Sequence, residues 1–558
     1  MAVVNMESFT LAHLPIVKEY AHRMGFVEIV DRALTCGMHT SPGKVLLGLV
    51  MNVLCGRSPL YRIEEFFRIR DVALLLGEDM MAESLNDDAI GRVLDRIYNY
   101  GTWKIFSEVS LQAFRHFDVE CSVVHQDTTS VSVWGEYKPS PADPIIITNG
   151  FSKDKRPDLK QFIFSLLCVE GNLPLHAGIL DGNASDKKTN GKILMELPRI
   201  MAHHGVGERN FIYVADSALA TEENLSLMKD DIRFITRLPE NFGACKQLIS
   251  KAIVSGSWHD VGQLSNQIVK GRNICASYCL QEETLNLYGR SYRAVVVHSD
   301  AHDKRRQKRI DKAVRKDAAT LNTKVKELSS KEFFCLPDAQ KAAENLPCGD
   351  YHQLSISFEE RPVYGRGRPC KNGTRQVKEI RHRVLVNVSE NNDTIGKLRE
   401  EAGCFILLTN VPAEEKSGLE ILKTYKEQDG IEKNFGFLKD PLVTNDVFLK
   451  KPRRIEAMGL VLVLSLLLWR LMERNMRRKA TEENITLQGW NNSATAKPTT
   501  FMMASKFSPV FVGVKNGRRF LFTPLNNVQL AYLKALDVHP AVFTEMKPRD
   551  GCIRYRCP

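Results

Sequence analysis

Several features that define common protein classes are missing from this sequence. Residues 1–24 contain no continuous apolar stretch, so we expect no signal peptide. The longest apolar run, Ala457–Trp469, is shorter than the roughly 20 residues that a membrane-spanning helix needs. We therefore expect this run to be a buried helix, and the protein to have no membrane partner.

Metal-binding thiol pairs and nucleotide-binding loops are missing as well. The 13 cysteines are odd in number and none belongs to a Cys-x-x-Cys pair, which leaves no zinc-ligand spacing. Reduced thiols in a cytoplasmic protein are the expectation. The chain has no P-loop, no Gly-x-Gly-x-x-Gly, no His-Glu-x-x-His and no nucleophile elbow. A nucleotide cofactor, nicotinamide chemistry and serine hydrolysis therefore have no support.

Positive charge is present in excess, and it is clustered. The net charge is +11, which favours polyanionic partners. Residues 304–316 hold eight Lys or Arg against one Asp, and residues 361–383 hold eight against one Glu. The second segment contains Arg366-Gly-Arg368-Pro, the core of an AT-hook, which lies in narrow minor grooves. The alternative for this match is a solvated basic loop. We predict salt-sensitive DNA contacts at both segments, including Lys304, Arg305, Arg306, Arg366 and Arg368.

The order of elements predicts an α/β catalytic core. Residues 1–118 have helical periodicity throughout. From residue 122 to 237 the expected order is β-β-β-α-β-α-β, with strand, turn and strand at 122–133 around Asp127. Asp216 ends the fourth strand, a short apolar run typical of a buried parallel strand.

The pattern is then interrupted and resumes. Residues 300–328 are basic, with apolar steps that suggest a short helical hairpin or coiled-coil arm. Strands are expected at 354–358 and 383–388. After this insertion come a strand at 404–409 and a helix at 417–438.

One face of the 417–438 helix carries unusual chemistry. Tyr425, Gln428, Glu432 and Lys439 follow one another at steps of three, four and seven, so they point the same way on a helix. A carboxylate suits a metal ion, and a phenol and an ammonium suit phosphate oxygens. The alternative is a solvated polar helix, which Gly430 weakens by about 1 kcal/mol.

Three carboxylates can meet in such a core. The first and fourth strands can be neighbours, which brings Asp127 and Asp216 together, and a helix beside that edge adds Glu432. Clustered carboxylates repel one another unless cations intervene, and Mg²⁺ prefers such oxygen ligands. Two ions about 4 Å apart would serve phosphodiester cleavage. For each aspartate alone, the alternative is a turn or capping residue.

With these residues the chain resembles the DDE transposases of bacterial and archaeal insertion sequences. The family signature is Tyr-x2-Arg-x3-Glu-x6-Lys, matched here by Tyr425, Gln428, Glu432 and Lys439 with the spacing intact. The blocks at 150–161 and 181–186 also look like family blocks. The resemblance covers roughly residues 5–535. One residue departs from the signature, because the family Arg is Gln428 here, and a bidentate cationic contact becomes a neutral hydrogen bond.

The resemblance implies a fold and a mechanism. The fold is an RNase H-like core, a mixed five-stranded sheet with flanking helices, interrupted by a β-rich and helical insertion and preceded by an all-α domain. Asp127, Asp216 and Glu432 would hold two Mg²⁺ ions, with Mn²⁺ able to substitute. Tyr425, Gln428 and Lys439 would bind DNA phosphate near the cut.

The implied partners are double-stranded DNA, as terminal inverted repeats and target, and a second copy of the chain on paired ends. The place of action is the cytoplasmic nucleoid. In relatives an aromatic residue in the insertion can hold a flipped base, a role open to Trp258, although a lone Trp is more often a core residue.

Five segments are expected, and two other functions stay open. The segments are a helical N-terminal domain for DNA binding or dimerisation, two parts of the core around an insertion, and a small C-terminal domain, at 1–118, 119–239, 240–400, 401–479 and 480–558. The first alternative function is a transposase-derived DNA-binding protein without catalysis. The second is a metal-dependent nuclease without strand transfer.

Overall fold

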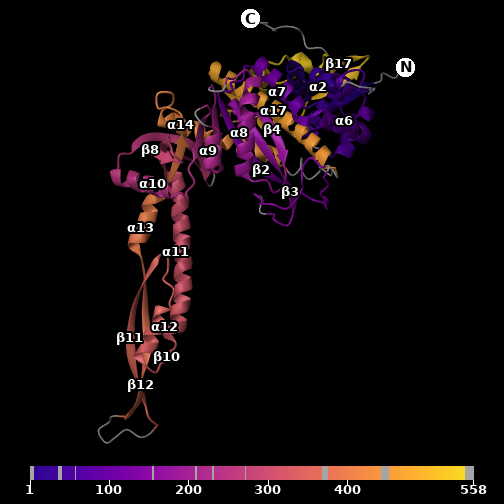
Figure 1. Cartoon of the computed structure of the whole chain (residues 1–558). Coiled ribbons are helices and arrows are strands. Elements are labelled where there is room, and N and C mark those ends of the chain that lie inside the picture. Colours follow the sequence, from indigo (N-terminus) through magenta and orange to yellow (C-terminus); the bar gives the residue numbers. More distant parts are fainter. Residues whose placement is uncertain are drawn as a thin grey trace. The chain divides into compact units, whose positions relative to one another are not determined.

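The computed structural model shows an α/β protein made of two compact units. Unit 1 combines residues 1–236 and 424–558, and unit 2 comprises residues 237–423 (Figure 1). The predicted insertion, 240–400, lies inside unit 2. The structure describes residues 6–34, 40–56, 58–141, 143–153, 156–207, 210–228, 231–269, 272–366, 375–440 and 451–546.

Unit 1 contains five strands of a mixed sheet. Their spatial order is β4-β3-β2-β5-β6. β2 and β3 are antiparallel, as are β3 and β4, whereas β2, β5 and β6 run parallel. The bounds are Val123–Val133 for β2, Lys160–Val169 for β3, Leu173–Leu180 for β4, Ile212–Ala215 for β5 and Arg233–Arg237 for β6.

The expected turn at Asp127 is wrong, since β2 continues through it as one strand. Nine residues of β2, from His125 to Val133, pair with β3 in unbroken register. The backbone hydrogen bonds of a continuous ladder favour extension here, although three polar residues stand in a row at 128–130. Asp127 therefore lies in the middle of a strand, not in a turn.

Helices cover the sheet of unit 1. α8 (Asp186–His203) connects β4 to β5, and α9 (Glu222–Met228) connects β5 to β6. α7 (Thr102–Phe117) and α17 (Pro452–Glu482) pack against β4. Figure 1 shows α17 running through the body of this unit.

α17 contains the longest apolar run. Among the described residues it is the one helix long and apolar enough to cross a membrane by length and composition. Of its most apolar window, 94% is buried inside the protein. The expectation of a buried helix at Ala457–Trp469 is therefore confirmed, and such burial is typical of the core helix of a soluble protein.

The N-terminal segment is mainly helical, with one exception. Its longer helices are α1 (Leu14–Arg23), α2 (Phe26–Leu34), α3 (Pro42–Met51), α6 (Asp87–Tyr100) and α7. Met6–Thr10, however, forms strand β1 and pairs antiparallel with β16 (Phe511–Lys515), which pairs in turn with β17 (Arg518–Leu521). The all-α expectation is wrong at this strand, because a partner from the far end of the chain satisfies its backbone groups. The C-terminal segment adds helices α18 (Thr500–Phe507) and α19 (Asn527–Ala535).

Unit 2 combines a group of strands with a long helix and a hairpin. β7 (His259–Val269), β8 (Arg272–Leu287), β9 (Arg290–Ser299) and β13 (Cys404–Thr409) form successive antiparallel pairs. The remaining longer elements are α10 (Gly243–Ser255), α11 (Asp300–Ser329), α12 (Leu336–Glu344), β11 (His352–Tyr364), β12 (Val377–Glu390) and α13 (Asn392–Glu401).

Two expectations for this unit need correction. α11 is one continuous helix, not a helical hairpin, because the apolar side chains Val314, Leu321 and Leu328 are all buried on one face. The strands expected at 354–358 and 383–388 are the middle of a much longer hairpin, β11–β12, in which polar residues alternate with apolar ones.

The helix expected at 417–438 is interrupted near Gln428. It consists of α14 (Gly418–Lys426) and α15 (Asp429–Leu438). Between them the backbone N–H groups of Gln428 and Gly430 bond to carbonyls only three residues earlier, a tighter turn than the α-helix. Gly430 lies directly against Asn172, where a Cβ atom would stand 1.8 Å from the Asn172 Oδ1. The glycine that weakens a helix therefore allows this helix to approach the β3–β4 turn.

Candidate active site

Asp127 lies on β2, and Asp216 directly follows the neighbouring parallel strand β5. Val123 pairs with Ile212 and His125 with Val214, and two further steps of this register bring Asp127 level with Asp216. Neighbouring strands are about 4.8 Å apart. The sequence prediction that these two residues meet is thus supported by the strand order.

A third aspartate, which the sequence prediction did not include as a site residue, joins the pair. Asp186 stands in the first turn of α8 and accepts a hydrogen bond from Thr128 Oγ1, 2.6 Å from its Oδ1. Thr128 is the residue that follows Asp127 on β2. The only signal for Asp186 in the sequence was its place in the block 181–186.

Lys153 places a positive charge among these carboxylates. Its Nζ lies 3.8 Å from Asp127 Oδ1 and 4.0 Å from Asp186 Oδ2. The same ammonium donates to the Thr128 carbonyl at 2.7 Å, which fixes its position beside β2. Lys153 belongs to the block 150–161, but nothing in the sequence pointed to its proximity to Asp127.

The electrostatics of the group show mutual repulsion. Burial raises the pKa of Asp127 to about 6, with the Asp216 and Asp186 carboxylates adding to the effect and Lys153 and the Thr128 N–H opposing it. Burial also raises the pKa of Asp216, again with a contribution from Asp186. Hard oxygen donors that repel one another fit a divalent cation, which would relieve that repulsion.

The raised pKa of Asp127, which is caused mainly by burial, predicts a pH-dependent effect on stability. A carboxyl group whose pKa is raised in the folded state destabilises the fold above that pKa, and the cost disappears as the pH falls from about 6 toward 4. In EDTA, we expect Asp127→Asn to raise the free energy of unfolding by about 2 kcal/mol at neutral pH and by little near pH 4. Urea titrations of both proteins across this pH range measure the difference. A difference that stays constant with pH would contradict this account.

The α14–α15 junction packs against the same strand. Gln428 Nε2 donates to the carbonyl of Gln126, 3.3 Å away and next to Asp127 in the chain. Glu427 Oε2 lies 3.8 Å from Nε2 of His125, which is buried. Gln428 thus contacts the strand that carries the first aspartate.

Glu432 lies on the first turn of α15 and is exposed. Among the described residues no hydrogen bond or ion pair joins it to Asp127 or Asp216. A group of three or more His, Cys, Asp or Glu side chains that could hold a metal is likewise not found in the described part of the chain. The structure therefore brings two of the three predicted ligands together and leaves the third on a helix packed beside them.

The other two signature residues lie at opposite ends of the junction. Tyr425 is half-buried near the end of α14, and Lys439 is half-buried at the C-cap of α15. Lys439 is eleven residues beyond Gln428, or roughly 16 Å along a helix. The four residues therefore do not form one helical face, as expected from the sequence, since the helix is interrupted between Tyr425 and Glu432.

The residues predicted to contact DNA in unit 2 have different environments. Lys304 and Arg305 are exposed on α11, whereas Arg306 forms an ion pair with Glu240. Arg366 is exposed, and Arg368 lies outside the described residues. Trp258 is half-buried and meets His298 edge to face, with 6.0 Å between ring centroids.

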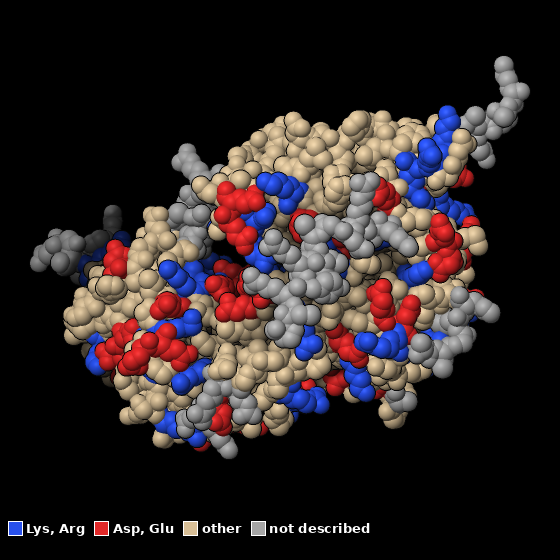
Figure 2. Space-filling model, turned by 90° about the horizontal axis from the view of Figure 1, so that it is seen from above, with Lys and Arg blue, Asp and Glu red and all other residues tan. Residues whose placement is uncertain are grey.

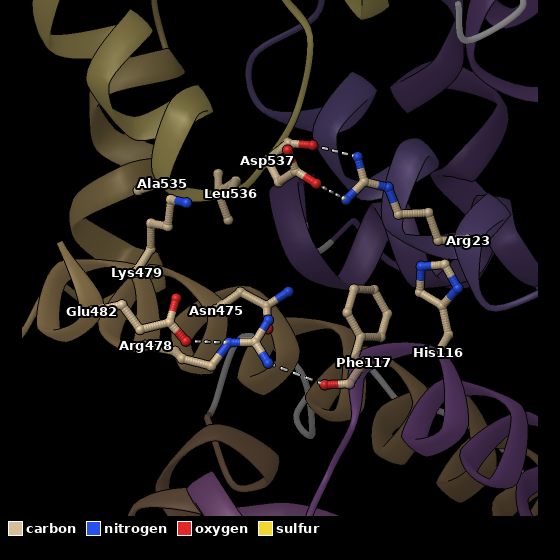
Figure 3. Close-up of a pocket in the computed structure, with 10 residues that line it drawn as sticks. All are labelled: Arg23, His116, Phe117, Asn475, Arg478, Lys479, Glu482, Ala535, Leu536 and Asp537. Atoms are coloured by element: carbon tan, nitrogen blue, oxygen red, sulfur yellow. Dashed lines mark hydrogen bonds and ion pairs between the residues drawn. The ribbon is translucent and has the colours of Figure 1, made fainter. Parts of the chain in front are cut away.

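A separate hollow in unit 1 contains none of the predicted site residues. It has a volume of about 310 Å³ and lies where the end of α17 meets α1, α7 and the segment after α19 (Figure 3). Its charges are matched across the space, with Arg23 facing Asp537 and Arg478 facing Glu482. This balance distinguishes the hollow from the aspartate cluster, where negative charge is in excess.

Comparison with known proteins identifies one match. Residues 6–111 match the family described as a domain of unknown function (DUF4277). This segment runs from β1 into α7 and ends before the first of the clustered aspartates. A comparison with curated proteins found no match.

Proposed function

We propose that the protein is a DDE transposase that cuts and joins DNA at the ends of an insertion sequence. The observation that carries this proposal is that Asp127 on β2 and Asp216 at the end of the neighbouring parallel strand β5 lie close enough to influence each other's charge, with Asp186 beside them. The strand order β4-β3-β2-β5-β6, with three antiparallel and then two parallel strands, is the order expected of an RNase H-like core. Both features agree with the family resemblance of the sequence.

The proposed chemistry is phosphodiester hydrolysis followed by transesterification. When bound, two Mg²⁺ ions would supply charge to activate the attacking oxygen and to stabilise the leaving one. Asp127, Asp216 and Glu432 would hold these ions. Water attacks phosphorus and releases a 3′-hydroxyl, which then attacks a second phosphodiester and displaces its 3′-oxygen.

The remaining residues orient the DNA. Tyr425 and Lys439 bind phosphate oxygens near the cut, and Gln428 donates one neutral hydrogen bond where the family signature has a bidentate Arg. The enzyme acts in the cytoplasm as a dimer on paired DNA ends, because two ends must be cut together.

A DNA-binding protein without catalysis is the second candidate. Gln428 favours it, as does the exposed position of Glu432 without contact to either aspartate in the described structure. A metal-dependent nuclease without strand transfer shares the same aspartates and differs only in its products.

Cleavage of a labelled duplex carrying the terminal repeats that flank the gene tests the proposal. With Mg²⁺ we expect nicks that end in a 3′-hydroxyl and, with a target plasmid present, joined products. EDTA abolishes both. Glu432→Gln is expected to lose cleavage and keep DNA binding, whereas Glu223→Gln, a change at an exposed residue of α9, keeps both.

Each alternative has its own result in this assay. Binding without cleavage by any of the three proteins would favour the non-catalytic candidate, and Gln428→Arg is then the next variant. Cleavage without joined products would favour the nuclease.

A further inference from the structure

α11 separates its charges by face. Its packed face carries the buried side chains of Val314, Leu321 and Leu328. Leu328 belongs to a small core with Phe333, Phe358 and Val384, which joins the end of α11 to the hairpin β11–β12 (Figure 1). The helix is therefore held in place along one side only.

The acidic side chains of the basic half of α11 are engaged on or near the packed side. Asp303 Oδ1 accepts from Gln307 at 3.1 Å, and Asp311 Oδ1 lies 3.2 Å from an Arg399 nitrogen. Asp317 Oδ2 lies 2.8 Å from His352 Nδ1. These contacts hold the acidic side chains away from the outward face of the helix, where a solvated helix would otherwise mix charges of both signs.

The outward face of the same half carries cations alone. At 100° per residue, the exposed Lys and Arg side chains fall within an arc of roughly 140°. Over that arc there is no acidic residue from position 304 to 326. The members of this outward stripe are Lys304, Arg305, Lys308, Arg309, Lys312, Arg315 and Lys316, all exposed. Lys304, at the start of the stripe, also lies 3.5 Å from Asp300 Oδ2 and is the member whose charge is shared with a carboxylate.

Arg306 is not part of this stripe, because it points to the side and pairs with Glu240. The face of the molecule in Figure 2 shows a different distribution, since positive and negative side chains alternate over its described surface. The outward stripe differs from that face in carrying charge of one sign.

We propose that the outward stripe binds the phosphate backbone of double-stranded DNA without reading its sequence. The stripe spans about 18 Å of helix, and a duplex carries one negative charge per about 1.7 Å of its axis. Over that length the two strands of the duplex together carry about ten phosphates, and those on the near side can meet the seven cations. The choice of duplex DNA as the polyanion rests on the proposed function. The existence of the stripe follows only from the charges and burial of the residues of α11.

The salt dependence of binding tests the stripe. Each phosphate contact contributes about 0.9 to the slope of log affinity against log salt concentration. Changing Lys308, Arg309, Lys312 and Lys316 together to Gln is expected to reduce the slope on a duplex of unrelated sequence by about three to four. The assay uses the full chain carrying Glu432→Gln, so that no DNA is cut.

A control variant with equal net charge makes the result specific. Its four changed residues are exposed lysines of unit 2 outside the outward stripe, namely Lys324, Lys331, Lys341 and Lys397. We expect its slope to fall by less than one, and both variants to melt at the wild-type temperature. An unchanged slope for the stripe variant, or an equal loss in the control, would overturn the proposal.

Failure of the stripe and failure of the transposase proposal remain distinguishable. If the stripe variant has a reduced slope but the wild-type protein does not cleave DNA, the stripe proposal stands and the transposase proposal fails. If the wild-type protein cleaves DNA but the stripe variant has an unchanged slope, the transposase proposal stands and the stripe proposal fails. The same slopes are measured on single-stranded DNA and on heparin. If the stripe variant had a reduced slope on these polyanions but a wild-type slope on duplex DNA, the choice of duplex DNA would be contradicted.

Discussion

Replacing Asp127 or Asp216 by Asn is expected to lower the rate of DNA cleavage by about a thousandfold. Each substitution removes a charged oxygen donor at the point where β2 and β5 lie side by side. The loss of one ligand from a site for two cations removes several kcal/mol of transition-state stabilisation. DNA affinity measured in Ca²⁺ or EDTA should stay within about twofold of wild type, since most affinity comes from Lys and Arg contacts to phosphate.

The matched control for these variants is Asp537→Asn. Asp537 belongs to the same unit, its side chain is 89% exposed, and its carboxylate lies 3.9 Å from Arg23 in a long ion pair. It should cleave at the wild-type rate, because exposed ion pairs contribute little. Near-normal cleavage by Asp127→Asn and Asp216→Asn would show that the aspartate pair is structural.

Replacing Glu473 by Ala is expected to destabilise unit 1 by about 3–5 kcal/mol. Glu473 is buried in α17, with Oε1 2.8 Å from Arg470 and 2.9 Å from Arg477. Arg470 is buried as well and donates to Asn434 of α15 at 2.7 Å. Without Glu473 the Arg470 guanidinium loses its charged partner in a buried position, and the contact that ties α15 to α17 is weakened.

Urea unfolding measures this effect, with Glu482→Ala as its control. Glu482 lies on the same helix and faces Arg478 at 3.7 Å, but it is exposed. Its removal should cost less than about 1 kcal/mol. Equal effects of the two substitutions would show that the buried network does not stabilise the link between α15 and α17.

The strands of unit 1 were predictable because their sequence signals are local. Apolar runs and turn residues predicted the order β-β-β-α-β-α-β from residue 122 to 237, in which β3, β4, β5 and β6 lie, and strand order then implied that Asp127 meets Asp216. Lys153 and Asp186 come from a loop and a helix start that carry no local sign of the distances to Asp127.

Other differences also arise from contacts distant in the chain. The interruption at Gln428 depends on Gly430 approaching Asn172, which belongs to another turn of the core. β1 forms only because β16, from the other end of the chain, offers an edge. The single long α11 depends on the hairpin that buries its apolar face. Periodicity predicts which side of an element is apolar, but it does not predict which distant segment covers it.

Cleavage by Asp216→Cys in Mg²⁺ and in Mn²⁺ tests the central claim most directly, because the claim is that Asp216 itself holds the catalytic cation. A thiolate is a poor ligand for Mg²⁺ and a better one for the softer Mn²⁺. We predict no cleavage by the variant in Mg²⁺ and partial recovery in Mn²⁺, with wild type active in both. Wild-type rates for Asp216→Cys in Mg²⁺ would contradict a metal-binding role for Asp216.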